Sequence, residues 1–121
     1  MIEARKPTVL AVHADGGITV GVEGMDGNTP VTVLVRLPAN LDRNAAKVEV
    51  VIPERLVSMS VDGRGFRHAI GSEGRLWTDR NGEWVAMEVG TERLYGLRCL
   101  EDKVFVVGEE GLRLQIGRAH V

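Results

Sequence analysis

Hydrophobic residues recur at alternate positions in several short stretches of the chain, a pattern typical of β-strands with one buried face. In residues 31–37 (VTVLVRL) every second residue is Val or Leu. Two further stretches are rich in β-branched residues, and their apolar residues alternate only in part: residues 48–52 (VEVVI) and 83–89 (EWVAMEV). Residues 104–107 (VFVV) are apolar throughout, which predicts an inner strand covered on both faces.

Turn signals separate these stretches at short intervals. The chain has 15 glycines, and four Asp-Gly or Asn-Gly pairs mark tight turns: Asp15-Gly16, Asp26-Gly27, Asp62-Gly63 and Asn81-Gly82. Residues 40–47 (NLDRNAAK) could hold a helical turn, but the segment is too short for much more. We therefore expect an all-β, antiparallel fold.

A Gly-x-Glu-Gly motif occurs three times, at residues 21–24, 71–74 and 108–111. The match extends beyond the motif, because AIGSEGRLW (69–77) aligns with VVGEEGLRL (106–114). An aspartate precedes each copy, and in the middle copy it stands further away, which indicates a longer turn. Self-similarity at a period of about 40 residues indicates a repeat architecture.

We expect each repeat to contain four successive strands. An Asp-containing turn follows the first strand, the Gly-x-Glu-Gly turn follows the second, and a further turn follows the third. We place the units at about 8–56, 57–93 and 94–115, with an insertion around 38–47. Such a unit is typical of a β-propeller blade, because stacking covers the faces that one small sheet leaves open. The second Gly of each motif should supply a positive φ in a hairpin, and the first should let a neighbouring backbone come close.

The repeats resemble a known family. Residues 93–114 (RLYGLRCLEDKVFVVGEEGLRL) are similar to blades of the broad β-propeller group with Asp-box (YVTN/BNR-like) and photosystem II stability-factor-like repeats. Residues 75–89 (RLWTDRNGEWVAMEV) resemble its third strand, Asp-box turn and fourth strand. The family's turn typically reads Ser-x-Asp-x-Gly-x-Thr-Trp. Here Asp79, Gly82 and Trp84 remain, whereas the spacing differs and the Thr is missing.

A closed propeller needs at least about four blades, and this chain supplies about two to three. We therefore expect either that several copies complete one ring or that the chain is a piece of a longer protein. The last six residues, 116–121 (IGRAHV), share nothing with the repeat and resemble the translation of a sequencing-library adapter. We expect this tail to lie outside the fold.

Charge and composition narrow the possible partners. The net charge is −2 and the cations are scattered, so no basic patch for nucleic acid is indicated. No apolar run reaches the roughly 20 residues of a membrane span, and the N-terminal stretch lacks the apolar region of a signal peptide. The single cysteine, Cys99, cannot close a disulfide within the chain. These features predict a cytoplasmic protein without membrane or nucleic-acid partners.

The chain offers few residues for catalysis or metal binding. His13, His68 and His120 have no partners at metal-ligand spacing. We interpret His13 and His68 as hydrogen-bonded structural residues, and His120 falls in the tail. Cys99 is expected to pack in the first strand of its unit rather than to act as a nucleophile. We assign no catalytic, cofactor-binding or metal-ligating residue.

We expect the acidic residues of the repeat to lie in its turns and not to form a catalytic or metal site. Three glutamates are the third residues of the motif copies: Glu23, Glu73 and Glu110. Repeat symmetry spreads them apart, which argues against a paired acid–base site and predicts solvated turn positions. Three aspartates stand in the preceding turns: Asp15, Asp62 and Asp102. No Asp-rich calcium loop surrounds them, so we expect them to shape turns through side-chain-to-backbone hydrogen bonds.

Three aromatic residues are further candidates. Trp77 and Trp84 flank a turn, and Trp84 takes the place of the Asp-box tryptophan. Packing between blades is the expected role of both, with sugar stacking by Trp77 as the alternative. Tyr95 and the scattered arginines are faintly similar to the tyrosine nucleophile and arginine cluster of sialidases. The residues next to Tyr95 do not support that role.

These observations favour a non-catalytic propeller-type module, which we expect to be a fragment of a longer propeller. It would serve as a binding or assembly scaffold for a protein or carbohydrate partner, through its loops. One alternative is a fragment of an Asp-box glycoside hydrolase of the sialidase type. The other is a self-associating structural or lectin-like protein whose copies complete a ring. An open propeller would expose apolar faces such as that of residues 104–107, so we expect an oligomer or a marginally stable chain.

Overall fold

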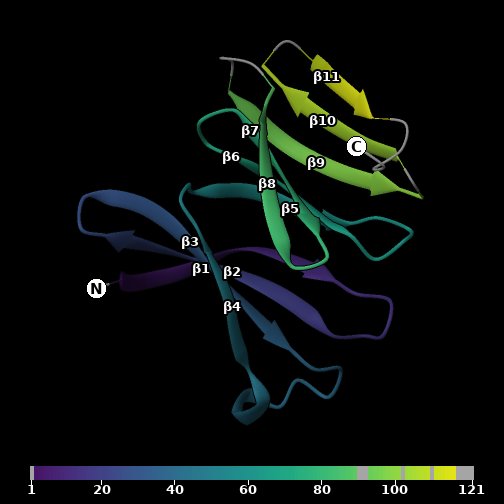
Figure 1. Ribbon diagram of the computed structural model, residues 1–121. Helices are drawn as coiled ribbons and strands as arrows, with labels where there is room; N and C mark the ends of the chain where they lie inside the picture. Colours follow the sequence, from purple (N-terminus) through teal and green to yellow (C-terminus); the bar gives the residue numbers. More distant parts are fainter. Residues whose placement is uncertain (1, 90–92, 102, 110, 117–121) are drawn as a thin grey trace. The chain divides into compact units, whose positions relative to one another are not determined.

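The computed structural model describes residues 2–89, 93–101, 103–109 and 111–116, with side chains described from residue 6 to residue 111 within these ranges. There the chain forms eleven strands and one 3₁₀ turn, in antiparallel sheets of four, four and three strands (Figure 1). The predicted all-β, antiparallel fold is confirmed. No helix in these ranges is long and apolar enough to cross a membrane. The chain divides into two compact units, Met1–Leu56 and Val57–Val121, which are described separately.

The first unit is a four-stranded meander, in which each strand pairs with its neighbours in sequence (Figure 1). Its strands are β1 (Ile2–Val12), β2 (Ile18–Asp26), β3 (Thr29–Leu37) and β4 (Lys47–Ile52). The 3₁₀ turn η1 (Arg43–Ala45) lies between β3 and β4, where the sequence predicted an insertion and a helical turn. The hydrophobic pattern therefore located β3 and β4 correctly.

The first Gly-x-Glu-Gly copy is not a turn, which corrects the sequence prediction. Gly24 pairs with Val31 inside the β2–β3 ladder, and β2 continues to Asp26. The hairpin is made instead at Gly27, whose φ of 63° lies in the left-handed region. The Asp-Gly pair supplies the preferred turn residues, so the strand extends past the motif to reach them.

Gly21, the first glycine of that copy, allows a close approach of side chains rather than of a backbone. It pairs with Val9 on β1 and with Leu34 on β3. A Cβ at Gly21 would collide with Cγ2 of Val9 and lie 2.9 Å from Cγ2 of Thr32. The absence of a side chain at Gly21 therefore leaves room above β2 for side chains of β1 and β3.

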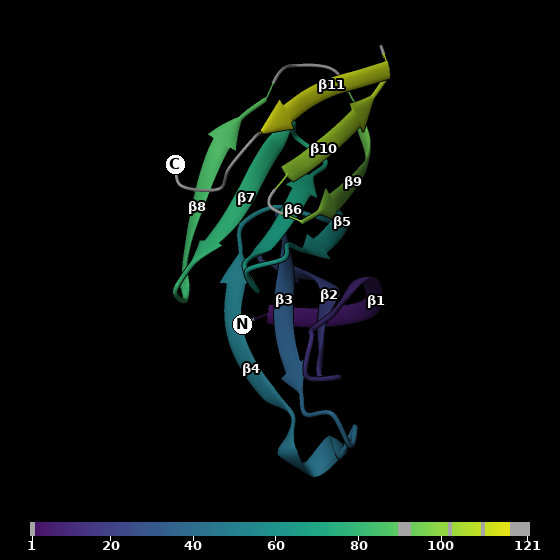
Figure 2. The same ribbon diagram turned by 90° about the vertical axis from the view of Figure 1, so that its right-hand side faces the viewer.

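The second unit contains two sheets (Figure 2). The four-stranded sheet has the order β5 (Leu56–Val61), β6 (Arg67–Gly71), β7 (Arg75–Arg80) and β8 (Glu83–Glu88). The three-stranded sheet is made of β9 (Leu94–Leu100), β10 (Lys103–Gly108) and β11 (Gly111–Ile116), with β10 in the middle. Both sheets are meanders, so each follows the strand order that the repeat predicted.

The hairpin glycines of the second unit agree with the sequence prediction, whereas the start of the predicted tail does not. Gly74 and Gly111, the second glycines of the later motif copies, have φ values of 86° and 95°, so their predicted role is confirmed. The tail does not begin at residue 116, however, because Ile116 ends β11 and pairs with Val104. Residues 117–121, including His120, lie outside the described residues.

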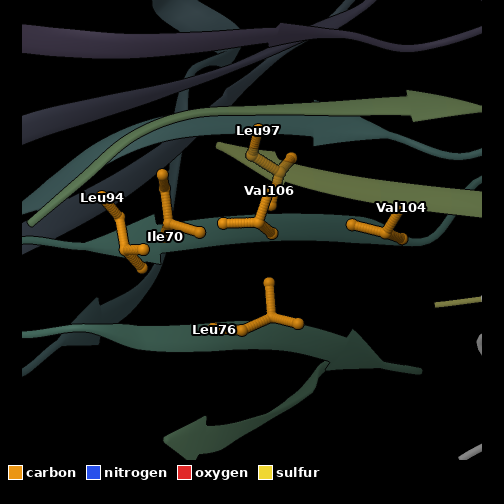
Figure 3. Packing of buried hydrophobic residues seen from close by; sticks show 6 residues of the cluster. All are labelled: Ile70, Leu76, Leu94, Leu97, Val104 and Val106. Atoms are coloured by element: carbon orange, nitrogen blue, oxygen red, sulfur yellow. The ribbon is translucent and has the colours of Figure 1, made fainter. Parts of the chain in front are cut away.

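A shared hydrophobic core joins the two sheets of the second unit. Figure 3 shows its six residues, which come from β6, β7, β9 and β10: Ile70, Leu76, Leu94, Leu97, Val104 and Val106. Phe105 is only half-buried, and Val107 keeps 43% of its surface exposed. The prediction that residues 104–107 are covered on both faces is therefore wrong. One face of β10 enters the core, and the opposite face remains accessible.

Strands β5 and β9 lie side by side and run in the same direction. The Ser58 hydroxyl lies 3.4 Å from the carbonyl oxygen of Leu97 and 3.3 Å from its amide nitrogen, and can donate to one and accept from the other. Two residues further along, the Cys99 amide donates to Oγ of Ser60 at 3.2 Å. The serine side chains of β5 thus fix the register between β5 and β9, the first strands of two consecutive sheets.

Candidate functional site

The turn between β5 and β6 is organised by Asp62. Its Oδ1 atom accepts hydrogen bonds from the amides of Arg64 at 2.9 Å and Phe66 at 3.0 Å. The Asp15 carboxylate likewise accepts from the Gly17 amide at 2.8 Å, in the turn between β1 and β2. The predicted turn-shaping role is confirmed for both aspartates, and Asp102 lies outside the described residues.

Asp62 also forms a buried pair with His68 on β6. Nε2 of His68 lies 2.9 Å from Oδ2 of Asp62, and Nδ1 lies 3.2 Å from the Thr78 hydroxyl. The side chains of His68 and Asp62 are 2% and 0% exposed. An ionised carboxylate can only accept, so the Nε2–H group donates to Asp62. The prediction that His68 is a hydrogen-bonded structural residue is confirmed.

Burial and hydrogen bonding act on Asp62 in opposite directions. Burial raises the pKa of Asp62, because it disfavours the charged carboxylate. The hydrogen bonds from His68 and from the amides of Phe66 and Arg64 outweigh this effect, and the pKa lies below its ordinary value. The carboxylate is therefore ionised at neutral pH and held by three donors.

Carboxylate, imidazole and hydroxyl follow one another in this cluster, the order found in proton-relay sites. A general base must, however, come within hydrogen-bond reach of the substrate proton. Both ring nitrogens of His68 already have partners, and the ring is almost completely buried. The arrangement is suited to holding the β5–β6 turn against β6 and β7.

A second polar cluster connects β6, β7 and β8. Nε and Nη2 of Arg67 lie 2.9 and 2.8 Å from Oδ2 of Asp79, with side chains 6% and 10% exposed. Oδ1 of Asp79 accepts a hydrogen bond from the Gly82 amide at 2.7 Å. The Arg67 guanidinium also lies over the Trp84 ring, 5.2 Å from its centroid. The residues that carried the Asp-box resemblance thus brace the β7–β8 hairpin.

The tryptophans differ in exposure. Trp77 on β7 is 8% exposed, so its ring offers little surface for stacking on a sugar. Trp84 on β8 is half-buried and contacts Arg67. Tyr95 on β9 is 55% exposed. Packing between blades, the role predicted for the tryptophans, stays a prediction.

Cys99 is poorly suited to nucleophilic chemistry. It lies on β9 beside the hydrophobic core, as the sequence predicted. Burial and the nearby charge of Asp62 raise the pKa of its thiol to about 11, although a hydrogen bond with Ser60 opposes the shift. Because the thiolate is the reactive form, the thiol is almost unreactive at neutral pH.

The remaining candidates lie apart from these clusters. His13 lies 2.7 Å from the Thr19 hydroxyl, so its predicted hydrogen bond is confirmed. Glu73 is an exposed turn residue as predicted, whereas Glu23 lies within β2 and pairs with Arg55 at 3.1 Å. Glu110 falls outside the described residues. Among the described residues, no group of three or more His, Cys, Asp or Glu side chains could hold a metal ion.

Sequence reasoning missed four residues of these clusters: Ser58, Ser60, Arg67 and Thr78. Two signals were available. Ser58 and Ser60 alternate along one strand, and Arg67 precedes His68 in a strand that is otherwise apolar. No family model matches the chain, and no curated protein is significantly similar to it.

Proposed function

We propose that the chain is a non-catalytic β-propeller-type repeat module that serves as a scaffold for binding or assembly. The observation that carries the proposal is the parallel alignment of β5 with β9, the first strands of two consecutive meanders. Propeller blades are consecutive sheets of a repeat, stacked so that their first strands lie side by side and run in the same direction. The unit order in the sequence supports the same interpretation.

A non-catalytic role is supported by the use of the polar residues. The side-chain pairs Asp62–His68 and Arg67–Asp79 are buried and hold turns and hairpins. The only cysteine has a raised pKa and lies against the core. None of these groups combines an accessible nucleophile with a base that a substrate could reach.

A scaffold needs accessible surface, and the three-stranded sheet offers it. Leu100 and Val107 are 64% and 43% exposed, and the neighbouring Arg98 is exposed as well. Arg98 pairs with Phe105 across β9 and β10, which places a cation beside an aromatic ring on that side. Apolar, aromatic and Arg side chains are typical of protein-binding surfaces.

Light scattering on a size-exclusion column tests the assembly proposal. We expect an oligomer or a marginally stable chain, because an incomplete ring exposes the apolar faces of its terminal blades. A stable, well-dispersed monomer with cooperative unfolding would contradict it. Turnover of fluorogenic glycosides that is lost in Tyr95→Phe would favour the hydrolase alternative and contradict the non-catalytic role.

A further inference from the structure

We propose that the turn between β5 and β6 is a latch between the two sheets of the second unit. The buried Asp62–His68 pair of the four-stranded sheet holds the Gly63 amide on the carbonyl oxygen of Glu101, next to β9 of the other sheet. When this latch opens, β5 moves away from β9, while the core that joins the two sheets stays packed. The inference concerns contacts within the second unit and does not depend on the proposed scaffold function.

The first observation is a direct contact between the main chains of two turns. The Gly63 amide, in the β5–β6 turn, donates a hydrogen bond to the carbonyl oxygen of Glu101, in the turn between β9 and β10. A Cβ at Gly63 would lie 3.1 Å from that oxygen and 3.2 Å from the carbonyl carbon and the Cα atom of Glu101. Main-chain atoms have little freedom to move away, so the absence of a side chain at Gly63 is what lets the two turns meet.

The second observation is that side chains of the four-stranded sheet fix the position of Gly63. Asp62 accepts hydrogen bonds from the amides of Arg64 and Phe66, beyond Gly63 in the chain, and from the ring of His68 on β6. The Asp62 amide also donates to the carbonyl oxygen of Phe66 at 2.9 Å. Because Gly63 follows Asp62 directly, a change in the buried pair displaces the amide that reaches the other sheet.

The third observation is that side chains hold the rest of the seam between β5 and β9. The two strands belong to different hydrogen-bonded sheets, and Ser58 and Ser60 bond to the main chain of Leu97 and Cys99. Serine hydroxyls can exchange such partners for water when the strands separate. The six core residues of Figure 3 come from β6, β7, β9 and β10, and β5 contributes none of them. The seam can therefore open locally while this core remains intact.

Cys99 reports whether the seam is open. Its amide donates to Oγ of Ser60, and its side chain packs against the core. It stands two residues before Glu101, so Ser60 and the latch cover the same stretch of β9. A thiol reagent reaches Cys99 more readily when β5 moves away, and the labelling rate therefore measures how often the seam opens.

Labelling of Cys99 with a disulfide reagent at pH 8, at urea concentrations below the unfolding transition, tests the latch. In the parent chain the rate should not depend on urea, because a local opening exposes little new surface. Gly63→Ala should accelerate labelling at least about tenfold, since the added methyl group pushes against the Glu101 main chain. Gly96→Ala, on the same strand as Cys99, is the control. A Cβ there meets nothing within 4 Å, and the rate should stay within about twofold of the parent.

Hydrogen exchange tests the contribution of the buried pair without altering Gly63. In Asp62→Asn the Gly63 amide should exchange at least about tenfold faster than in the parent, after correction for the intrinsic rate next to the new side chain. This exchange should again be independent of urea at low concentrations. Glu73→Gln, at an exposed turn position of the same unit, is the control and should leave the Gly63 rate unchanged.

Three results would overturn the proposal. Equal labelling rates in Gly63→Ala and Gly96→Ala would show that the Gly63–Glu101 contact does not hold the seam. An unchanged Gly63 exchange rate in Asp62→Asn would show that the buried pair does not hold the latch. Labelling of the parent chain that rises with urea as steeply as global unfolding would show that β5 and β9 separate only when the whole unit unfolds.

Discussion

Nε2 of His68 lies 2.9 Å from Oδ2 of Asp62, and both side chains are almost completely excluded from solvent. A buried ion or hydrogen-bonding group is costly when its partner is removed, because the remaining group cannot return to water. The pair also anchors a turn, because the same carboxylate accepts from the amides of Arg64 and Phe66. Its loss should therefore affect the whole second unit.

Asp62→Asn is expected to lower the free energy of unfolding of the second unit by roughly 2–4 kcal/mol. Both tryptophans, Trp77 and Trp84, belong to this unit, so tryptophan fluorescence during urea unfolding reports on it. Glu73→Gln, at an exposed turn position, is the control and should cost less than about 1 kcal/mol. Equal losses in the two variants would contradict the role of the pair.

Asp62 should also make stability depend on acid pH. Its folded pKa lies below the ordinary value of 3.8, so its stabilisation is complete above that value and is lost as pH falls through the folded pKa. The parent chain should lose stability more steeply than Asp62→Asn as pH falls below about 4. Urea unfolding across the acid range measures this, and parallel pH profiles of the two proteins would speak against it.

Cys99 should react slowly with a disulfide reagent in the folded protein. Burial raises its pKa to about 11 from an ordinary value of 9.0, so the thiolate fraction at pH 8 falls by about a hundredfold. The reaction followed by absorbance should be fast in denaturant and should accelerate in the native protein as pH rises toward 11. A native rate equal to the unfolded rate at pH 8 would show that the thiol is accessible and unshifted.

Gly21→Ala is expected to destabilise the first unit by about 1–3 kcal/mol, because the added methyl group overlaps side chains from both neighbouring strands. Gly96→Ala is the matched control, since a Cβ at Gly96 would meet nothing within 4 Å. Circular dichroism during thermal unfolding, with amide signals of the first unit by nuclear magnetic resonance, locates the effect. A stable Gly21→Ala variant would mean that β1 and β3 can separate at this point.

The sequence determined the strands and most of the turns, because these depend on neighbouring residues. Alternating apolar residues located β3 and β4, and Gly74 and Gly111 adopt the positive φ expected of hairpin glycines. The same reasoning failed at Gly24, because the Asp26-Gly27 pair nearby is a stronger turn signal and β2 extends to it. Local patterns compete, and here the Asp-Gly pair prevails over the repeated motif.

The tertiary structure decided which groups are buried together. The sequence marked Asp62 as a turn residue and His68 as a structural histidine, but only the folding of β6 back along the Asp62 turn and against β7 brings them to Thr78. Likewise, the apolar residues 104–107 look equally buried in the sequence. Stacking covers the side of Val104 and Val106 and leaves Val107 accessible, because packing against β6 and β7 occurs on one face of the sheet.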